Sequence, residues 1–316
     1  MLRGMAGNRS LTVVIAAYNE EAALPEMHRR LSAVLDGLDA ESRVLYVDDG
    51  SRDDTWGVLQ RLAGADARVS LLRLARNFGK ELALTAGLDH VDTDAALVLD
   101  ADGQDPPELI PAFVAKWREG FDVVYGTRTR RDGETWLKRL TAAGFYRVMT
   151  RLSDTPIPRD TGDFRLMSRP VLEALRQLRE RQRFMKGLFT WVGFRQVSLP
   201  YERAPRLAGG SKFNYWRLWN LAIEGITSFS TVPLRLATYV GVLTALVAFG
   251  WGMWIVARTL LWGDPVQGWP SLMTVVLFLG GVQLVALGII GEYLGRLYVE
   301  VKQRPLYLIA ESRPPQ

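Results

Sequence analysis

Two carboxylates separated by a single residue, Asp100 and Asp102, form the chemically most informative pattern in this chain. They directly follow a short apolar run, residues 95–99, which has the length and composition of a buried strand. Pro106 and Pro107 then end the extended segment and favour the start of a helix. Two carboxylates at a strand end can share a hard divalent cation, Mg²⁺ or Mn²⁺, whose other ligands are commonly substrate phosphates. The pattern therefore predicts a cation site suited to a diphosphate, although an Asp-x-Asp alone also occurs by chance in loops.

The composition excludes several classes of site. The chain has 316 residues, 48% hydrophobic and 23% charged, which is enough for two domains or for one large domain with an appendage. It has no cysteine, which excludes disulfides, cysteine-bound zinc, iron–sulfur clusters and a thiol nucleophile. Its two histidines are not in a metal-ligand spacing, so a histidine-based site is not expected. The net charge of +5 is compatible with nucleic acid, a membrane surface or anionic phosphates as partners.

Strand-like and helix-like segments alternate along the first part of the chain. This alternation predicts an α/β domain with a mainly parallel, doubly wound sheet. Such sheets bind ligands beyond the carboxyl ends of their strands, where the strand order reverses. We expect strands at residues 11–17, 43–47, 69–74, 95–99 and 121–125, and helices at residues 21–38, 54–63, 79–91 and 107–119.

Polar clusters follow three of the expected strands, at residues 18–20, 48–51 and 100–104. They therefore lie where a doubly wound sheet binds its ligand. The glycine-rich phosphate loops of dinucleotide-binding folds and of P-loop ATPases are absent from the sequence, which argues against a dehydrogenase or such an ATPase. A bound diphosphate would have to be neutralised by a metal and by basic side chains.

Two long uncharged segments near the end of the chain predict a membrane hairpin. Residues 236–257 and 265–291 carry no charge, and each exceeds the roughly 20 residues that a helix needs to cross a membrane. The spans are expected at about 234–257 and 269–291, and tryptophans gather near the turn, as they do at membrane interfaces. The alternative is a buried helical hairpin of a soluble protein. Basic residues follow the second span, which predicts that the tail and the N-terminal part lie in the cytoplasm: Arg296, Lys302, Arg304 and Arg313.

The segment before the hairpin has apolar and aromatic residues at helical spacing, which predicts an amphipathic helix lying in the headgroup plane. A helix packed on the soluble domain is the alternative. The first apolar run is too short for a signal peptide, so the amino end is expected to stay in the cytosol. The predicted organisation is a catalytic domain at 1–210, an interfacial helix at 211–231, a transmembrane hairpin at 232–294 and a cytoplasmic tail at 295–316.

Six segments, in this order, resemble motifs of glycosyltransferase family 2, and more closely those of its polyprenyl-phosphate glycosyltransferases. That group contains dolichol-phosphate mannose synthase and bacterial bactoprenol glucosyltransferases. Together with the two spans, the segments cover nearly the whole chain. They are residues 14–21, 47–51, 100–108, 161–166, 183–187 and 209–212.

The resemblance implies a GT-A-type, Rossmann-like domain that uses a nucleotide-sugar donor, Mg²⁺ or Mn²⁺, and a lipid phosphate acceptor, with no nucleic acid partner. Two departures from the family pattern are Gly103, where leucine is usual, and Ala16, where proline is common. The nucleotide pocket would be lined by Ala16, Tyr18, Glu20, Val47, Asp49 and Ala101, and the metal would be held by Asp100, Asp102 and Gln104. The phosphates would be faced by Arg128 and by Lys138 or Arg139, and Arg206 and Lys212 would close over them.

The reaction implied by the resemblance is an inverting transfer of a sugar to a polyprenyl phosphate at the cytoplasmic face of the cell membrane. Glucose from UDP-glucose is the first expectation, because the segments at 162–165 and 183–187 resemble those of bactoprenol glucosyltransferases. The acceptor is already an anion, so the main difficulty is to bring two anions together. Asp163 is the candidate for orienting the acceptor or acting as a base.

Alternatives remain at the sequence level. The chain could be a family 2 polymerase or transferase with a sugar hydroxyl acceptor, or a non-catalytic membrane protein that binds a nucleotide sugar. Asp163 could instead cap a helix or form a buried salt bridge, and residues 48–51 could be only a turn. Glycines such as Gly241 and Gly280 allow close packing of the spans, so a homo-oligomer is also possible.

Overall fold

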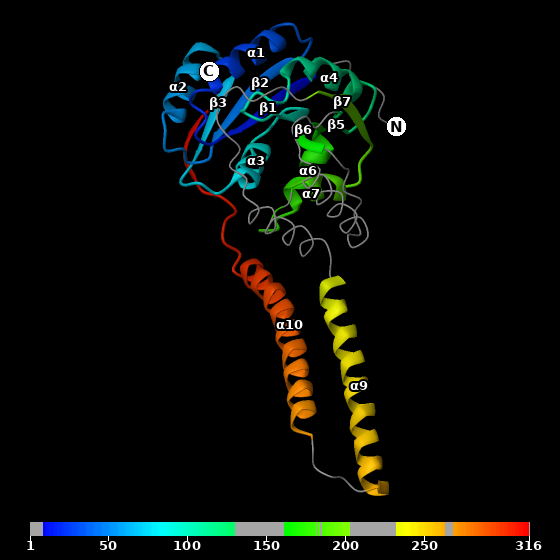
Figure 1. Ribbon diagram of the computed structural model, residues 1–316. Coiled ribbons are helices and arrows are strands. Elements are labelled where there is room, and N and C mark those ends of the chain that lie inside the picture. Colours follow the sequence, from blue (N-terminus) through cyan, green and yellow to red (C-terminus); the bar gives the residue numbers. More distant parts are fainter. Residues whose placement is uncertain are drawn as a thin grey trace. The chain divides into compact units, whose positions relative to one another are not determined.

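The computed structural model describes residues 9–129, 161–181, 183, 185–202, 232–262 and 268–315. The chain divides into two compact units (Figure 1). The first, called the sheet unit, contains the described residues up to 202 and those from Arg304 onward. The second, called the helical unit, contains the two long helices between them.

The sheet unit is built on one mixed eight-stranded sheet in the order β7-β5-β6-β4-β1-β2-β3-β8. Its centre is parallel, because β1 pairs in parallel with both β2 and β4, and β2 with β3. β5 and β7 are also parallel, whereas β6 runs antiparallel to β4 and β5, and β8 antiparallel to β3. The strands are β1 Ser10–Ala17, β2 Glu41–Asp48, β3 Val69–Leu74, β4 Ala95–Val98, β5 Val123–Arg128, β6 Thr161–Ser168, β7 Gln196–Tyr201 and β8 Ile309–Arg313.

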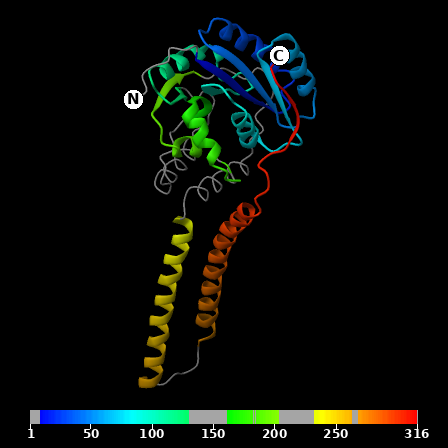
Figure 2. The same ribbon diagram turned by 180° about the vertical axis from the view of Figure 1, so that it is seen from behind.

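Helices cover both faces of the sheet, as the predicted doubly wound fold requires (Figure 2). One face packs on α1, α2 and α4, where Leu31, Leu59 and Phe113 meet Ile15 in the main apolar core. The other face packs on α3, through Ala83 and other small residues, with α6 and α7 on the same side. The helices are α1 Leu24–Asp36, α2 Thr55–Ala65, α3 Lys80–Asp89, η1 Pro107–Leu109, α4 Ile110–Arg118, α6 Arg169–Gln177 and α7 Met185–Trp191.

The close approach of α3 to the centre of the sheet depends on a glycine. A Cβ atom added to Gly87 would lie 2.4 Å from Cγ1 of Val14 and 3.2 Å from Cγ2 of Val47. Any larger side chain here would force α3 away from β1 and β2. The position of α3 matters because its first residue reaches the carboxyl ends of the strands.

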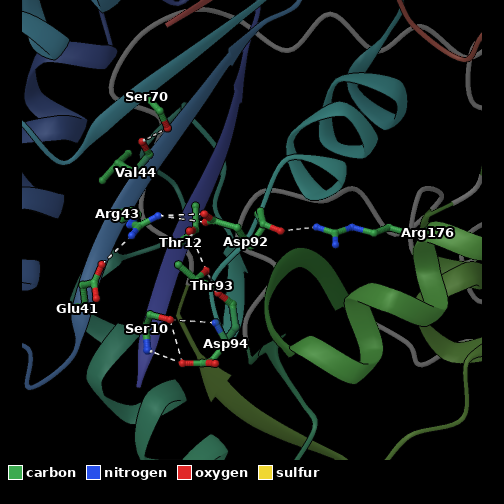
Figure 3. A network of polar contacts seen from close by, with 12 residues as sticks. Ser10, Thr12, Glu41, Arg43, Val44, Ser70, Asp92, Thr93, Asp94 and Arg176 are labelled. Atoms are coloured by element: carbon green, nitrogen blue, oxygen red, sulfur yellow. Dashed lines mark hydrogen bonds and ion pairs between the residues drawn. The ribbon is translucent and has the colours of Figure 1, made fainter. Parts of the chain in front are cut away.

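A polar network fixes the opposite ends of the strands, around the start of β1 and the loop before β4 (Figure 3). Asp94 accepts hydrogen bonds from the amide and the hydroxyl of Ser10, both at 2.9 Å. The hydroxyls of Thr12 and Thr93 lie 2.8 Å apart, and Arg43 pairs with Asp92 at 3.1 Å. These contacts hold the amino ends of the parallel strands, so the network has a structural role away from the expected ligand edge.

The helical unit consists of α9, Val232–Trp262, and α10, Trp269–Val301. Both are long and apolar enough to cross a membrane, over Leu236–Trp262 and Phe278–Val301, with mean hydropathies of 2.0 and 1.5. Large apolar side chains such as Phe249 and Leu284, both 71% exposed, lie on their outer surfaces. Two long helices are thus present where the hairpin was predicted, and α10 continues beyond the end expected for the second span.

The glycines of α9 and α10 do not lie at places where the two helices approach each other closely. Apart from the backbone of its own helix, a Cβ atom added at any of them would meet no atom of the described residues within 4 Å. Packing of α9 on α10 therefore does not require them, and a homo-oligomer stays a prediction. The glycines singled out from the sequence are Gly241, Gly250, Gly280, Gly281 and Gly288.

The end of the chain belongs to the sheet unit. β8 pairs antiparallel with β3, and the Ala75 amide donates a hydrogen bond of 2.9 Å to the Leu308 carbonyl. The Tyr307 hydroxyl donates to Asp89 at 2.9 Å, which ties the same segment to α3. The sequence predicted only a cytoplasmic tail here, whereas the structure shows that part of it is an edge strand. The predicted interfacial helix at 211–231 lies outside the described residues.

Candidate active site

The antiparallel pairing of β4 with β6 brings two predicted site residues together. Val98 at the end of β4 pairs with Arg165 of β6. Antiparallel neighbours run in opposite directions, so Asp100, two residues beyond the end of β4, comes near Asp163, two residues before Arg165 in β6. We call this side of the sheet, where β1 to β5 end and β6 begins, the carboxyl edge.

Lys80, the first residue of α3, joins these two carboxylates. Its Nζ lies 2.6 Å from Oδ1 of Asp100 and 2.6 Å from Oδ2 of Asp163. The aspartate side chains are only 16% and 11% exposed, whereas that of Lys80 is 45% exposed. One ammonium therefore neutralises two largely buried carboxylates, at the end of a side chain that is itself partly exposed.

This pairing favours the charged forms of Lys80 and Asp163. Burial acts to lower the pKa of Lys80, but Asp100 and Asp163 outweigh burial and raise that pKa. Burial acts to raise the pKa of Asp163, but Lys80 and Lys186 hold it well below its usual range. Asp163 lies within β6 and not at a helix cap, so of its two structural alternatives the buried salt bridge is the one observed.

A third acid, Glu81, and a second base, Lys186, extend the cluster toward α7. The Met185 amide donates a hydrogen bond of 3.0 Å to Oε2 of Glu81, which links the start of α7 to the start of α3. Burial and the neighbouring Asp163 raise the pKa of Glu81 to about 7. Burial lowers the pKa of Lys186, against the opposing effect of Asp163. The carboxyl edge therefore brings several acidic and basic side chains close together.

Arg128 approaches the cluster from the end of β5. Its Nε donates to the Tyr201 hydroxyl at 3.5 Å, and that hydroxyl donates to Oδ1 of Asp105. A Cβ atom on Gly162 would lie 2.9 Å from Nη2 of Arg128, so the guanidinium rests against the backbone beside Asp163. The structure thus places a permanent positive charge next to the acidic pair.

The loop after β4 presents the predicted metal ligands. Oδ1 of Asp102 accepts a hydrogen bond of 3.1 Å from the Gln104 amide. Gly103 has a φ of 71°, a left-handed conformation that glycine adopts without strain, so the turn suits this departure from the family pattern. Across the described residues, no group of three His, Cys, Asp or Glu side chains could hold a metal. Two carboxylates and an amide oxygen nevertheless fit Mg²⁺ or Mn²⁺ when phosphate oxygens complete the coordination.

The carboxylate of Asp49, which was predicted to contact the nucleotide, is hydrogen-bonded to other groups of the protein. Its carboxylate accepts hydrogen bonds from the amides of Phe78 and Gly79, at 2.7 and 2.9 Å, and from Nδ2 of Asn77 at 3.0 Å. Burial raises the pKa of Asp49, and the two amides oppose that rise. These bonds fix the loop that leads into Lys80.

The other predicted nucleotide residues lie around the ends of β1, β2 and β4. Tyr18 and Glu20 follow β1 and are partly buried, and the Glu20 amide donates to the Thr55 hydroxyl at 2.9 Å. Ala16 is partly buried, Ala101 is 5% exposed, and Val47 is fully buried in the core against α3. Four predicted phosphate-binding residues lie outside the described residues: Lys138, Arg139, Arg206 and Lys212.

Residues 12–176 match the family described as Glycosyl transferase family 2. This chain belongs to glycosyl transferase family 2. A second match, over residues 232–297, is to the GtrB C-terminal hairpin, which covers α9 and most of α10.

Three relatives extend the family assignment to nearly the full length. The family 2 chain is 50% identical over 301 residues to an uncharacterized glycosyltransferase of Synechocystis, covering 95% of each. It is 47% identical over 302 residues to the bactoprenol glucosyl transferase of Shigella phage SfII, covering 96% of this chain and 98% of that one. It is 46% identical over 299 residues to a prophage bactoprenol glucosyl transferase homolog of Escherichia coli K12, covering 95% and 98%.

Among solved structures, glucosyl-3-phosphoglycerate synthase of Mycobacterium tuberculosis matches with a TM-score of 0.48 and 23% identity, over 69% of this chain and 78% of that one. The family match confirms the resemblance seen in the sequence. This glycosyltransferase is an enzyme with a GT-A-like α/β domain on a mixed sheet and two apolar C-terminal helices.

Sequence reasoning missed several residues of the carboxyl edge, namely Lys80, Glu81, Asp105, Lys186 and Tyr201. Lys186 lies in one of the family-like segments, which was the available signal for it. Lys80 and Glu81 stand at the start of an expected helix, where charged residues are ordinary. Tyr201 comes from β7, a strand that the sequence analysis did not predict.

Proposed function

We propose that this family 2 enzyme transfers a sugar, with inversion, from a nucleotide-diphosphate donor to a polyprenyl phosphate at the cytoplasmic face of a cell membrane. Glucose from UDP-glucose is the donor we favour, since two relatives at 46% and 47% identity are named bactoprenol glucosyl transferases or a homolog of one. The observation that best supports this proposal is the cluster of Asp100, Lys80 and Asp163 at the carboxyl edge. The same chain also matches the GtrB C-terminal hairpin.

The proposal divides the chemistry between a cation and the charged side chains. Asp100, Asp102 and Gln104 would hold Mg²⁺ or Mn²⁺, which when bound supplies Lewis-acid stabilisation of the departing diphosphate. Arg128, on the backbone beside Asp163, would offset the repulsion between the acceptor and donor phosphates. Lys138 or Arg139, with Arg206 and Lys212, would add positive charge around the same phosphates.

Asp163 fits an orienting role better than that of a strong base. A carboxylate whose pKa is held below its usual range by Lys80 and Lys186 has little tendency to take a proton. A polyprenyl phosphate needs no strong base, because it is already an anion at neutral pH. Asp163 would therefore position Lys80 and the acceptor. The nucleotide would lie along Ala16, Tyr18, Glu20 and Ala101, whereas the buried Val47 and Asp49 would support this pocket from behind.

The two long helices give the reaction its location. A polyprenyl phosphate lies at the bilayer surface, so an enzyme held in the same membrane meets it at a raised effective concentration. We propose that α9 and α10 cross the membrane as a hairpin, with the catalytic domain and both chain ends in the cytoplasm. The predicted interfacial helix at 211–231 would hold the domain near the headgroups.

The test is direct synthesis of the glycolipid. Purified full-length protein is incubated with labelled UDP-glucose and undecaprenyl phosphate, and the products are extracted into organic solvent. Label should enter the organic phase with Mg²⁺ or Mn²⁺ and remain in water with EDTA. A panel of other labelled nucleotide sugars identifies the donor. Label in a water-soluble glycan would instead favour a sugar hydroxyl acceptor, and bound donor without turnover would favour a non-catalytic protein.

The Asp102→Asn substitution tests the cation assignment. We expect glycolipid formation to fall by about 100-fold or more, because the diphosphate leaves without its stabilising charge. Unfolding temperature and membrane association should stay unchanged. Asp92→Asn is the matched control, since Asp92 pairs with Arg43 at the other end of the strands and should keep full activity. Full activity of Asp102→Asn would remove the cation from the proposal.

A further inference from the structure

We propose that Lys80 is an internal cation that competes with the divalent metal for Asp100, so that the donor-free enzyme binds metal weakly and the donor diphosphate relieves the competition. This inference rests on the proposed function, which assigns the metal to Asp100 and Asp102. It adds a positioning residue and an order to binding: metal and donor enter the site together.

The first observation is that the Lys80 ammonium already pairs with Asp100, a carboxylate that the proposal assigns to the metal. Nζ of Lys80 lies 2.6 Å from Oδ1 of Asp100, the carboxylate that a cation would need. The same Nζ lies 2.6 Å from Oδ2 of Asp163, so two largely buried carboxylates hold it, one from the loop after β4 and one from β6. Short charge-assisted contacts of this kind are the strongest hydrogen bonds in proteins. The Lys80 ammonium is therefore firmly held against a carboxylate of the proposed cation site.

The second observation concerns charge. A divalent cation on Asp100 and Asp102 would lie within a few ångströms of the Lys80 ammonium, and like charges repel strongly in a partly buried site. Metal binding must then either tolerate this repulsion or displace the ammonium from Asp100. Asp163 opposes displacement, because its Oδ2 would keep holding Lys80 close by. Both routes weaken the binding of metal alone.

The third observation is that the backbone of Lys80 is held while its side chain is accessible. Asp49 binds the amides of Phe78 and Gly79, which fixes the residues directly before Lys80. The Lys80 side chain as a whole is nevertheless 45% exposed, so its length is not enclosed by the protein. A diphosphate supplies negative oxygens both for the metal and for this ammonium. Lys80 can then exchange Asp100 for a phosphate oxygen without any change in the fold.

The consequence is positive coupling between metal and donor, which by linkage acts equally in both directions. A purely structural Lys80 makes a different prediction. If Lys80 only tied the end of β4 to the start of β6, its removal would loosen the two carboxylates and leave metal affinity unchanged or lower. The sign of the change in metal affinity therefore separates the two roles.

The experiment measures Mn²⁺ binding to the full-length protein by electron paramagnetic resonance of the free ion, without nucleotide. Lys80→Met removes the competing charge and should bind Mn²⁺ about tenfold more tightly than the unaltered protein. Lys80→Arg keeps a cation and should bind as weakly as the unaltered protein. Lys116→Met, which removes a surface lysine paired with Glu119, is the control and should change nothing. Lys80→Gln, also uncharged, replaces Lys80→Met if that variant does not fold.

A second arm repeats the titration with UDP present. UDP should raise the Mn²⁺ affinity of the unaltered protein about tenfold or more, and this gain should shrink in Lys80→Met. If the uncharged variants bind Mn²⁺ as tightly as the unaltered protein, or more weakly, the proposed role of Lys80 is wrong. The proposed function is then tested separately by the glycolipid assay. Absence of Mn²⁺ binding in every protein, with and without UDP, overturns the cation assignment and this inference together.

Discussion

The charged residues at the carboxyl edge are more buried than charged residues usually are, and the structure shows what makes this tolerable. Burying an isolated charge is costly, whereas a paired one is offset by its partner. Lys80 serves two carboxylates at once, and Arg165 of β6 stacks over the Phe189 ring with its Cζ 3.9 Å from the ring centre. Oδ1 of Asp163 is buried with no hydrogen-bond partner among the described residues. The charge on Asp163 is therefore offset mainly through its other oxygen, Oδ2, which pairs with Lys80.

Glu81 provides a pH-dependent prediction. Its pKa rises from an ordinary 4.5 to about 7 in the folded protein, so the folded state keeps a proton that the unfolded state releases between these values. Stability must then fall as pH rises from about 4.5 to 7. Glu81→Gln removes this loss and keeps an oxygen for the Met185 amide. We compare the unfolding free energy of the variant with that of the unaltered protein. This difference should shift in favour of the variant by at least about 1 kcal/mol when the pH is raised from 5 to 8.

Denaturant unfolding of both proteins at the two pH values measures this difference. Glu119→Gln, which alters an exposed glutamate paired with Lys116, is the control and should show the same pH dependence as the unaltered protein. A constant difference between Glu81→Gln and the unaltered protein across pH would mean that Glu81 titrates like an exposed glutamate.

At the scale of elements, the sequence predicted the parallel centre of the sheet, and the structure confirms β1 to β5 with small shifts at their ends. These strands are apolar runs between turn residues, which is the pattern that periodicity detects. β6 escaped detection although all its residues are buried, because Asp163 and Arg165 make it look like a surface segment. β8 escaped because it is short, polar and exposed. The partners that compensate the β6 charges come from α3 and α7, and local sequence patterns carry no information about them.

The same limit applies to the candidate site. Asp100 and Asp102 could be proposed from the sequence because they are neighbours in the chain and follow an apolar strand. The meeting of Asp100, Asp163 and Lys80 depends on β6 lying antiparallel beside β4 and on α3 starting near both. Alternation of strands and helices favours parallel neighbours, so it gave no indication of this pairing.

The contact of α3 with the sheet can be tested by two glycine substitutions. Gly87→Ala places a Cβ 2.4 Å from Cγ1 of Val14, which cannot move far, so we expect a loss of about 1–3 kcal/mol in unfolding free energy. Gly64→Ala in α2 meets nothing within 4 Å and should be neutral or stabilising by up to about 1 kcal/mol through helix propensity. Denaturant unfolding of the full-length protein compares them. Equal effects of the two changes would contradict the close approach of α3 to β1.

At the scale of the whole molecule, the pairing of β8 with β3 constrains how the chain can lie in a membrane. Both strands belong to the sheet unit, so the chain leaves this unit before α9 and returns to it after α10. An even number of crossings is therefore required if the helices enter a bilayer, and two apolar helices provide it. The basic residues that follow α10, including Lys302 and Arg304, add the charge bias typical of a cytoplasmic end.

The orientation can be measured because the chain has no cysteine of its own. A single cysteine is introduced either as Gly64→Cys, in the exposed part of α2, or as Gly268→Cys, directly before α10; both positions have open space around the added side chain. Intact cells are treated with a membrane-impermeant maleimide. With two crossings and a cytoplasmic sheet unit, Gly268→Cys should be labelled from outside and Gly64→Cys only after the cells are permeabilised. The reverse pattern would invert the orientation, and equal labelling of both positions in intact cells would show that α9 and α10 do not form a membrane-crossing hairpin.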